Sequence, residues 1–123
     1  MPLPVPAHRL LPVIEPLLAT VLCAELGSAD AIDPALLRQT TATMAGKLNQ
    51  MPRYMGLAIA GLTVAFDADG VRFGGGRFRD NAPDARLAQA RAWRDSRVPF
   101  LPDFMDFYVK MGVFVYWSHH EGE

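Results

Sequence analysis

Cysteine, lysine and long uncharged runs are scarce in this chain. The single cysteine, Cys23, excludes an internal disulfide, and its apolar neighbours indicate a small buried side chain rather than a nucleophile. No uncharged stretch reaches the roughly 20 residues that a membrane-spanning helix needs, so we expect no membrane span. The first ten residues lack the basic start and long apolar core of a signal peptide, and we therefore expect a cytoplasmic protein.

Charge is nearly balanced in total but unevenly distributed along the chain. The 123 residues suit one domain, and their net charge of −1 gives no reason to expect binding to nucleic acid or to an anionic membrane. Residues 72–97 carry seven Arg against three Asp, whereas residues 98–123 carry four acidic residues and one Lys. This arrangement indicates pairing within the fold or with a partner. The excess of Arg over Lys suits bidentate carboxylate pairing, although a G+C-rich genome gives the same bias.

Helix signals recur along the chain, and no internal repeat or sustained strand alternation interrupts them. Prolines at positions 2, 4 and 6 make residues 1–7 an extended arm. Asp33 as an N-cap before Pro34 predicts one helix start, and Gly27 predicts the end of another helix. We predict an all-α fold, a compact bundle of about five helices forming a single domain over 1–123. The predicted helices run from Leu10 or Pro16 to Leu26, and over 34–50, 52–66, 83–96 and 102–117.

Two stretches are apolar on every side of a helix. Residues 54–66 contain no charged side chain, and every position over 111–117 is apolar. A helix with this composition is buried either inside a bundle or beneath a partner. Gly56 and Ala60 lie on one face of the first stretch, with Gly61 beside them, and their small size permits close approach of a neighbouring helix.

The last predicted helix has one clear apolar face with a narrow polar stripe opposite it. The stripe ends at Lys110, after which the helix is apolar all round. Because one helix seldom buries both of its sides in a domain of this size, we interpret the end of this helix as a surface for another protein. The apolar face consists of Phe104, Phe107, Tyr108, Met111 and Val115, and the stripe of Asp103, Asp106 and Lys110.

Two short motifs have the residue types of binding sites but not the required context. Phosphate-binding glycine loops follow a strand, whereas residues 74–76 follow a charged loop, so we interpret these three glycines as a flexible connector. The adjacent residues His119 and His120 point about 100° apart on a helix, and only His8 remains as a third imidazole. We therefore interpret residues 118–123 as a solvated polar tail and expect no metal site.

The carboxylates do not assemble into a catalytic set. Asp103 and Asp106 fit helix capping and a solvent-facing stripe, and Asp67 and Asp69 fit a turn before Gly70. No Ser–His–Asp or Cys–His arrangement is evident. The sequence therefore gives no argument for an enzyme acting alone.

Residues 48–117 nevertheless follow a recognisable order. An apolar helix after "MP" leads through a glycine-containing loop and Phe78 to the Arg-rich helix "DARLAQARAWRDS", and then to an aromatic helix from "FLPDFMDFYVKMG" that ends in tyrosine and tryptophan. This order resembles the gluconate 2-dehydrogenase subunit 3-like family, the small helical subunits that accompany flavin-dependent oxidoreductases of the glucose-methanol-choline type. The matching positions are Phe78, Arg86, Trp93, Ser96, Phe104, Phe107 and Tyr108.

The resemblance implies a non-catalytic subunit that stabilises or helps to mature a larger partner. Such subunits generally bind no flavin, so no cofactor is expected in this chain and FAD is expected in the large subunit of a hetero-oligomer. Many members carry a twin-arginine export signal, which this sequence does not show, and a cytoplasmic complex is therefore expected. The residues expected at the partner interface are Tyr54, Phe78, Arg86, Trp93, Arg94, Phe104, Tyr108, Val113, Tyr116 and Trp117.

The aromatic residues also permit a function of another class. Aromatic side chains at helical spacing line pockets in some proteins and form plain core in others. The alternative prediction is a stand-alone helical module that binds an apolar small molecule between its aromatic helices.

Overall fold

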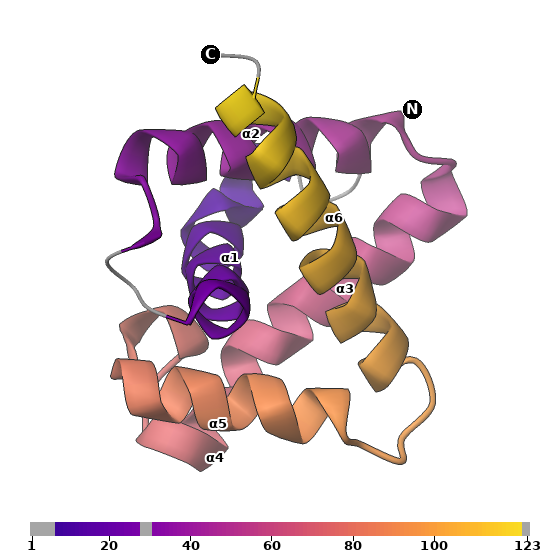
Figure 1. The fold of residues 1–123 in the computed structure, drawn as a ribbon. Helices are drawn as coiled ribbons and strands as arrows, with labels where there is room; N and C mark the ends of the chain where they lie inside the picture. The colour runs from indigo at the N-terminus through magenta and orange to yellow at the C-terminus, as the bar shows by residue number, and fades with distance from the viewer. Residues whose placement is uncertain (1–6, 28–30, 122–123) are drawn as a thin grey trace.

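The computed structural model describes residues 7–27 and 31–121, which contain helices and connecting turns but no strands (Figure 1). The predicted all-α class is therefore confirmed for this part of the chain. Apart from Ala7, the predicted N-terminal arm lies outside the described residues. The helices are η1 (Ala7–Leu10), α1 (Leu11–Leu26), α2 (Pro34–Gln50), α3 (Arg53–Asp69), α4 (Val71–Gly74), η3 (Phe78–Asp80), α5 (Pro83–Arg94) and α6 (Leu101–Glu121), of which η1 and η3 are 3₁₀ helices.

Local signals set the ends of the first two long helices. Gly27 adopts the left-handed conformation, with φ of 83°, and its N–H donates to the carbonyl of Cys23, which ends α1. The carboxylate of Asp33 accepts a hydrogen bond of 2.8 Å from the N–H of Ala35 and caps α2. The last helix is longer than predicted, because α6 continues through the supposed polar tail to Glu121.

Helices α1 and α6 occupy the middle of the bundle. In Figure 1, α2 crosses above them and α5 below them, and both outer helices pack against both central ones. The short elements α4 and η3 follow α3 and pack against α5 and α1, respectively. Elements from both ends of the chain therefore share one core.

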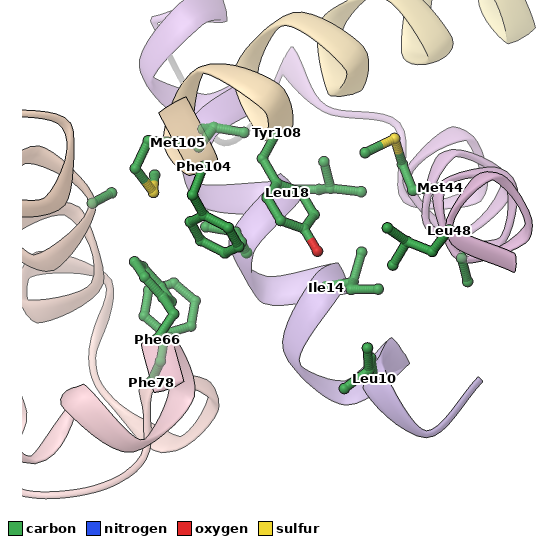
Figure 2. Close-up of a cluster of buried hydrophobic side chains, with 14 of the residues drawn as sticks. Leu10, Ile14, Leu18, Met44, Leu48, Phe66, Phe78, Phe104, Met105 and Tyr108 are labelled. Carbon is green, nitrogen blue, oxygen red and sulfur yellow. The ribbon is translucent and has the colours of Figure 1, made fainter. Parts of the chain in front are cut away.

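The core combines aliphatic and aromatic side chains, and Figure 2 shows Phe66, Phe78, Phe104 and Tyr108 beside leucine, isoleucine and methionine residues. Phe66 is fully buried, and its ring centroid lies 4.6 Å from that of Phe78, 4.8 Å from that of Trp93 and 6.0 Å from that of Phe104. The hydroxyl of buried Tyr108 lies 2.9 Å from Oγ1 of Thr63, which satisfies a polar atom that would otherwise destabilise the core. Burial raises the pKa of the Tyr108 phenol, so the side chain is neutral.

The predicted inner face of α6 is confirmed. Phe104, Tyr108 and Val115 are buried, and Phe107 and Met111 are partly buried. In contrast, the described residues do not cover α3 on every side, because Tyr54 is 75% exposed. The core therefore accounts for only one side of α3.

One continuous helical run among the described residues, Arg53–Gly74, meets the length and composition of a membrane span. The run has 22 residues, and its most apolar window has a mean hydropathy of 1.2. A third of that window is buried inside the fold, where α3 packs against α2 and η3. Core helices of soluble proteins have similar compositions, and in this fold the run is part of the bundle.

The glycine segment after α3 forms a packed corner, which corrects its interpretation as a flexible connector. Nδ2 of Asn81 donates to the carbonyl of Gly70 at 2.9 Å, and Oδ1 of Asn81 accepts from the N–H of Gly76 at 3.1 Å. Gly75 ends α4 with a φ of 83°, a conformation that favours glycine. The three glycines thus shape a turn that the buried side chain of Asn81 closes.

Gly70→Ala tests the close packing of this corner. A Cβ at Gly70 would lie 2.4 Å from the backbone nitrogen of Phe78 and 2.7 Å from the carbonyl oxygen of Gly76, and backbone atoms cannot swing aside as a side chain can. We expect the substitution to lower the free energy of unfolding by about 1–3 kcal/mol, measured by urea denaturation followed by circular dichroism.

Gly61→Ala is the matched control, because Gly61 lies within α3 and an added Cβ there meets no atom within 4 Å. We expect it to raise the free energy of unfolding by about 0.5–1 kcal/mol, since alanine favours a helix interior. Equal effects of the two substitutions would contradict the packed corner.

Candidate functional site

The structure separates the ten residues predicted at a partner interface into three groups. Five are buried in the core, which corrects their predicted place at a surface, because a partner cannot reach them without opening the fold. Two are partly buried and three are exposed. The buried residues are Phe78, Trp93, Phe104, Tyr108 and Tyr116, the partly buried ones are Arg86 and Val113, and the exposed ones are Tyr54, Arg94 and Trp117.

Arg86 contributes to the fold rather than to a free surface. Its Nε donates to the carbonyl of Phe78 at 3.1 Å, and its Nη2 donates to the carbonyl of Arg79. The guanidinium also lies 5.7 Å from the ring centroid of Phe78. Arg86 therefore joins α5 to η3, and the positions that carry the family resemblance have structural roles in this chain.

The two carboxylates near the end of α3 hold the same corner together. Buried Asp67 forms an ion pair of 3.2 Å with Nη2 of Arg79 and accepts a hydrogen bond from the N–H of the same residue. Asp69 forms a bidentate pair with Arg72 and accepts a hydrogen bond of 2.8 Å from Nε1 of Trp93. These contacts give both acids a structural role at this corner.

Asp69 is further poorly suited to accept a proton. Its pKa lies below the ordinary value of 3.8, mainly because Arg72 donates hydrogen bonds to the carboxylate. Partial burial raises the pKa and opposes this effect, whereas the hydrogen bond from Trp93 lowers the pKa further. A general base near neutral pH requires a higher pKa than this. The charge of Asp69 therefore serves the corner of α3, α4 and α5.

The remaining candidates for chemistry do not converge on one place. His119 is not fully solvated, since its Nε2 lies 2.8 Å from Oγ1 of Thr43 on α2. The side chains of His8, His120 and Glu121 lie outside the described part of the structure. Within that part, no group of three His, Cys, Asp or Glu side chains is arranged to hold a metal ion.

One long apolar surface is exposed along α3, and we call it the α3 outer face. It consists of Tyr54, Met55, Ala58, Gly61, Val64, Ala65 and Ala68, all of which are exposed. The spacing of Tyr54, Ala58, Gly61, Ala65 and Ala68 follows i, i+4, i+7, i+11 and i+14, which places them on one stripe of the helix. Met55 is 42% exposed and Val64 is 47% exposed, so larger apolar side chains accompany the small ones.

Smaller apolar surfaces lie on α6 and in the preceding loop. Phe114 and Trp117, three residues apart on α6, are 65% and 40% exposed. Phe100 is 71% exposed and is the only residue other than glycine with a positive φ, 76°, in the described chain. The predicted apolar surplus at the end of α6 is thus present, but Phe114 carries much of it and buried Tyr116 does not.

A groove runs between α1 and α5, two helices far apart in the sequence. Its larger hollow has a volume of about 650 Å³ and is lined mainly by α1, the start of α2 and the first turns of α5. A smaller hollow of about 200 Å³ shares four lining residues with it and extends toward α6. Cys23 lies in the wall of the larger hollow and is partly exposed, which corrects its predicted burial.

The predicted pocket between the aromatic helices is filled by the aromatic rings themselves. Neighbouring centroids lie 5.5 Å apart for Trp93 and Phe104, and 5.0 Å apart for Phe104 and Tyr108. The groove could not be predicted from the sequence, because no pattern relates α1 to α5. The outward stripe of α3 was not predicted either, although the regular spacing of Ala58, Gly61 and Ala65 could have indicated it.

Asp69→Asn tests the electrostatic role of the corner. Because the pKa of Asp69 is lowered in the folded chain, its contacts stabilise the fold above about pH 4, and this stability is lost as the pH falls through the lowered pKa. We expect the variant to lose less stability than the unmodified chain between pH 6 and pH 3, measured by urea denaturation.

Arg72→Gln provides a second arm of the same test. It removes the main cause of the lowered pKa of Asp69. We therefore expect this variant, too, to lose less stability than the unmodified chain between pH 6 and pH 3. Parallel pH profiles for all three proteins would contradict the assignment.

Comparison of the chain with protein-family models, with curated proteins and with solved structures found no match.

Proposed function

We propose that this chain is a non-catalytic helical subunit that binds a larger protein through the α3 outer face. The observation that carries this proposal is the absence of any charged residue over 54–66 in a helix whose outer side is exposed. A solvent-facing side of a helix normally carries charged and polar residues. An apolar surface of this kind is typical of protein interfaces.

The composition of the α3 outer face also suits close docking. The side chains of Ala58, Gly61 and Ala65 are small, so a partner helix can approach the backbone of α3 closely. Exposed Tyr54 at one end supplies an aromatic anchor, a residue type that is enriched where interfaces release most free energy. Phe114 and Trp117 provide a second exposed apolar surface on α6.

We further propose that the partner is an FAD-dependent oxidoreductase of the glucose-methanol-choline type. The support for this step is the resemblance of residues 48–117 to the small subunits of such enzymes. In this arrangement the partner holds the flavin and performs the oxidation, and the present chain stabilises the partner or assists its maturation. The buried positions of the resemblance, such as Phe78 and Trp93, would preserve the fold that presents α3.

The gene neighbourhood and the composition of the complex test the partner's identity. We expect a large flavoprotein to be encoded beside this chain, and the two purified proteins to form a complex that shows the visible absorption of flavin. A stable complex with a partner that lacks FAD, or no complex with the neighbouring flavoprotein, would contradict this part of the proposal.

Ala58→Glu tests the surface itself. A carboxylate at the centre of an apolar interface is left without water or a counter-ion, so we expect the affinity for the partner to fall at least tenfold, corresponding to about 1.4 kcal/mol, in isothermal titration calorimetry. Ala42→Glu, at an exposed position of α2, is the matched control and should leave the affinity unchanged.

Circular dichroism of both variants checks that the fold is retained. Unchanged binding by Ala58→Glu would exclude the α3 outer face as the interface. Flotation of the unmodified chain with phospholipid vesicles, abolished by Ala58→Glu, would instead indicate that α3 docks on a lipid surface.

A further inference from the structure

We propose that the groove between α1 and α5 binds an amphiphilic carboxylate, a single acyl chain that ends in a carboxylate group. This site is separate from the α3 outer face and does not depend on the proposed partner. It is inferred from the volume of the groove, its apolar walls and the unbalanced positive charge at its centre.

The groove consists of two neighbouring hollows that offer room for an acyl chain. The two hollows, of about 650 and 200 Å³, share Thr20 and Ala24 on α1, and Leu87 and Arg91 on α5. They therefore adjoin each other beside both helices, and we call the two together the channel. Its larger part lies in the volume range of small-molecule sites.

The walls offer apolar contacts along this channel. On the α1 side the lining side chains are small, namely those of Ala19, Cys23 and Ala24. The larger hollow is also lined by Ile32 before α2, Leu37 on α2 and Leu87 on α5. The Oγ1 of Thr20 already donates to the carbonyl of Pro16, so it adds no free donor. The walls thus favour a hydrocarbon chain over a polar ligand.

Positive charge lies where the two hollows meet. Arg91 lines both of them and is exposed, and no anionic side chain of the described residues pairs with it. Arg86 also lines the larger hollow, and its hydrogen bonds go to neutral carbonyl groups. An arginine fork without a carboxylate partner is well suited to bind a carboxylate.

The acidic groups of the groove lie apart from this centre or are paired. Glu25, in the smaller hollow, lies 4.0 Å from Arg94, and the two charges offset each other. Asp84 lies near the N-terminal end of α5, about two turns from Arg91 along the helix. A ligand with its carboxylate at Arg91 and its chain in the larger hollow therefore matches both the charge and the polarity of the groove.

Cys23 makes the proposal directly measurable, because it is the only cysteine and lies in the wall of the larger hollow. We expect dodecanoate, below its micelle concentration, to slow the reaction of Cys23 with N-ethylmaleimide at least fivefold in the unmodified full chain. Dodecyltrimethylammonium has the same chain length and the opposite charge, and it should protect Cys23 much less.

Two variants and one control test the charge of the groove and its free volume separately. Arg91→Gln should raise the dodecanoate concentration needed for half-protection about tenfold, whereas Arg97→Gln, an exposed arginine outside the groove, should not change it. Ala24→Leu narrows the channel at an exposed position and should abolish protection by dodecanoate. Circular dichroism verifies that each variant is folded.

Equal protection by the cationic and anionic amphiphiles, or unchanged protection in Arg91→Gln, would overturn the proposal. So would a result in which dodecanoate gives no protection and the flavoprotein partner does, because the groove would then be a protein-docking surface. Since the labelling uses this chain alone, its failure is distinguishable from a failure of the proposed subunit role.

Discussion

The burial of Phe66 is the constraint on which the rest of this fold depends. Its ring contacts aromatic side chains from η3, α5 and α6, and its carbonyl accepts a hydrogen bond from Nε2 of Gln89 on α5. Four elements therefore meet at one residue near the end of α3. The ion pairs of Asp67 and Asp69 surround this point and fix the chain as it turns into α4 and η3.

This constraint gives the aromatic residues a structural role. Several of the positions shared with small flavoprotein subunits, including Trp93 and Phe104, pack around Phe66. They hold α3 against the bundle by one side. Over residues 54–66 the other side of α3 has no charged residue to face water, and it remains a long apolar surface of the described chain.

The basic segment has a similar explanation. The ion pairs formed by its arginines run to Asp67, Asp69 and Glu25 and not to the acidic segment 98–123 within the described residues. Arg86 is held by backbone carbonyls, and Arg91 is the arginine that both hollows of the groove share. Of the arginines of α5, Arg86 therefore stabilises the corner, whereas Arg91 lines the groove.

The sequence by itself determined the all-α class, most helix ends and the inner face of α6. These features depend on contacts within a few residues, such as the cap at Asp33, the left-handed Gly27 and the 3.6-residue period of Phe104, Tyr108 and Val115. They could be predicted because each signal lies within one short stretch of the sequence.

Only the tertiary structure decided which side of α3, and which side of the apolar end of α6, is covered. Composition alone could not show that Tyr116 is buried, with its hydroxyl accepting from the N–H of Asp33, while Phe114 is exposed. The groove likewise exists only because α1 and α5 lie side by side although more than 50 residues separate them in the sequence. Burial and hollows arise from packing between distant segments, so no local pattern of residues specifies them.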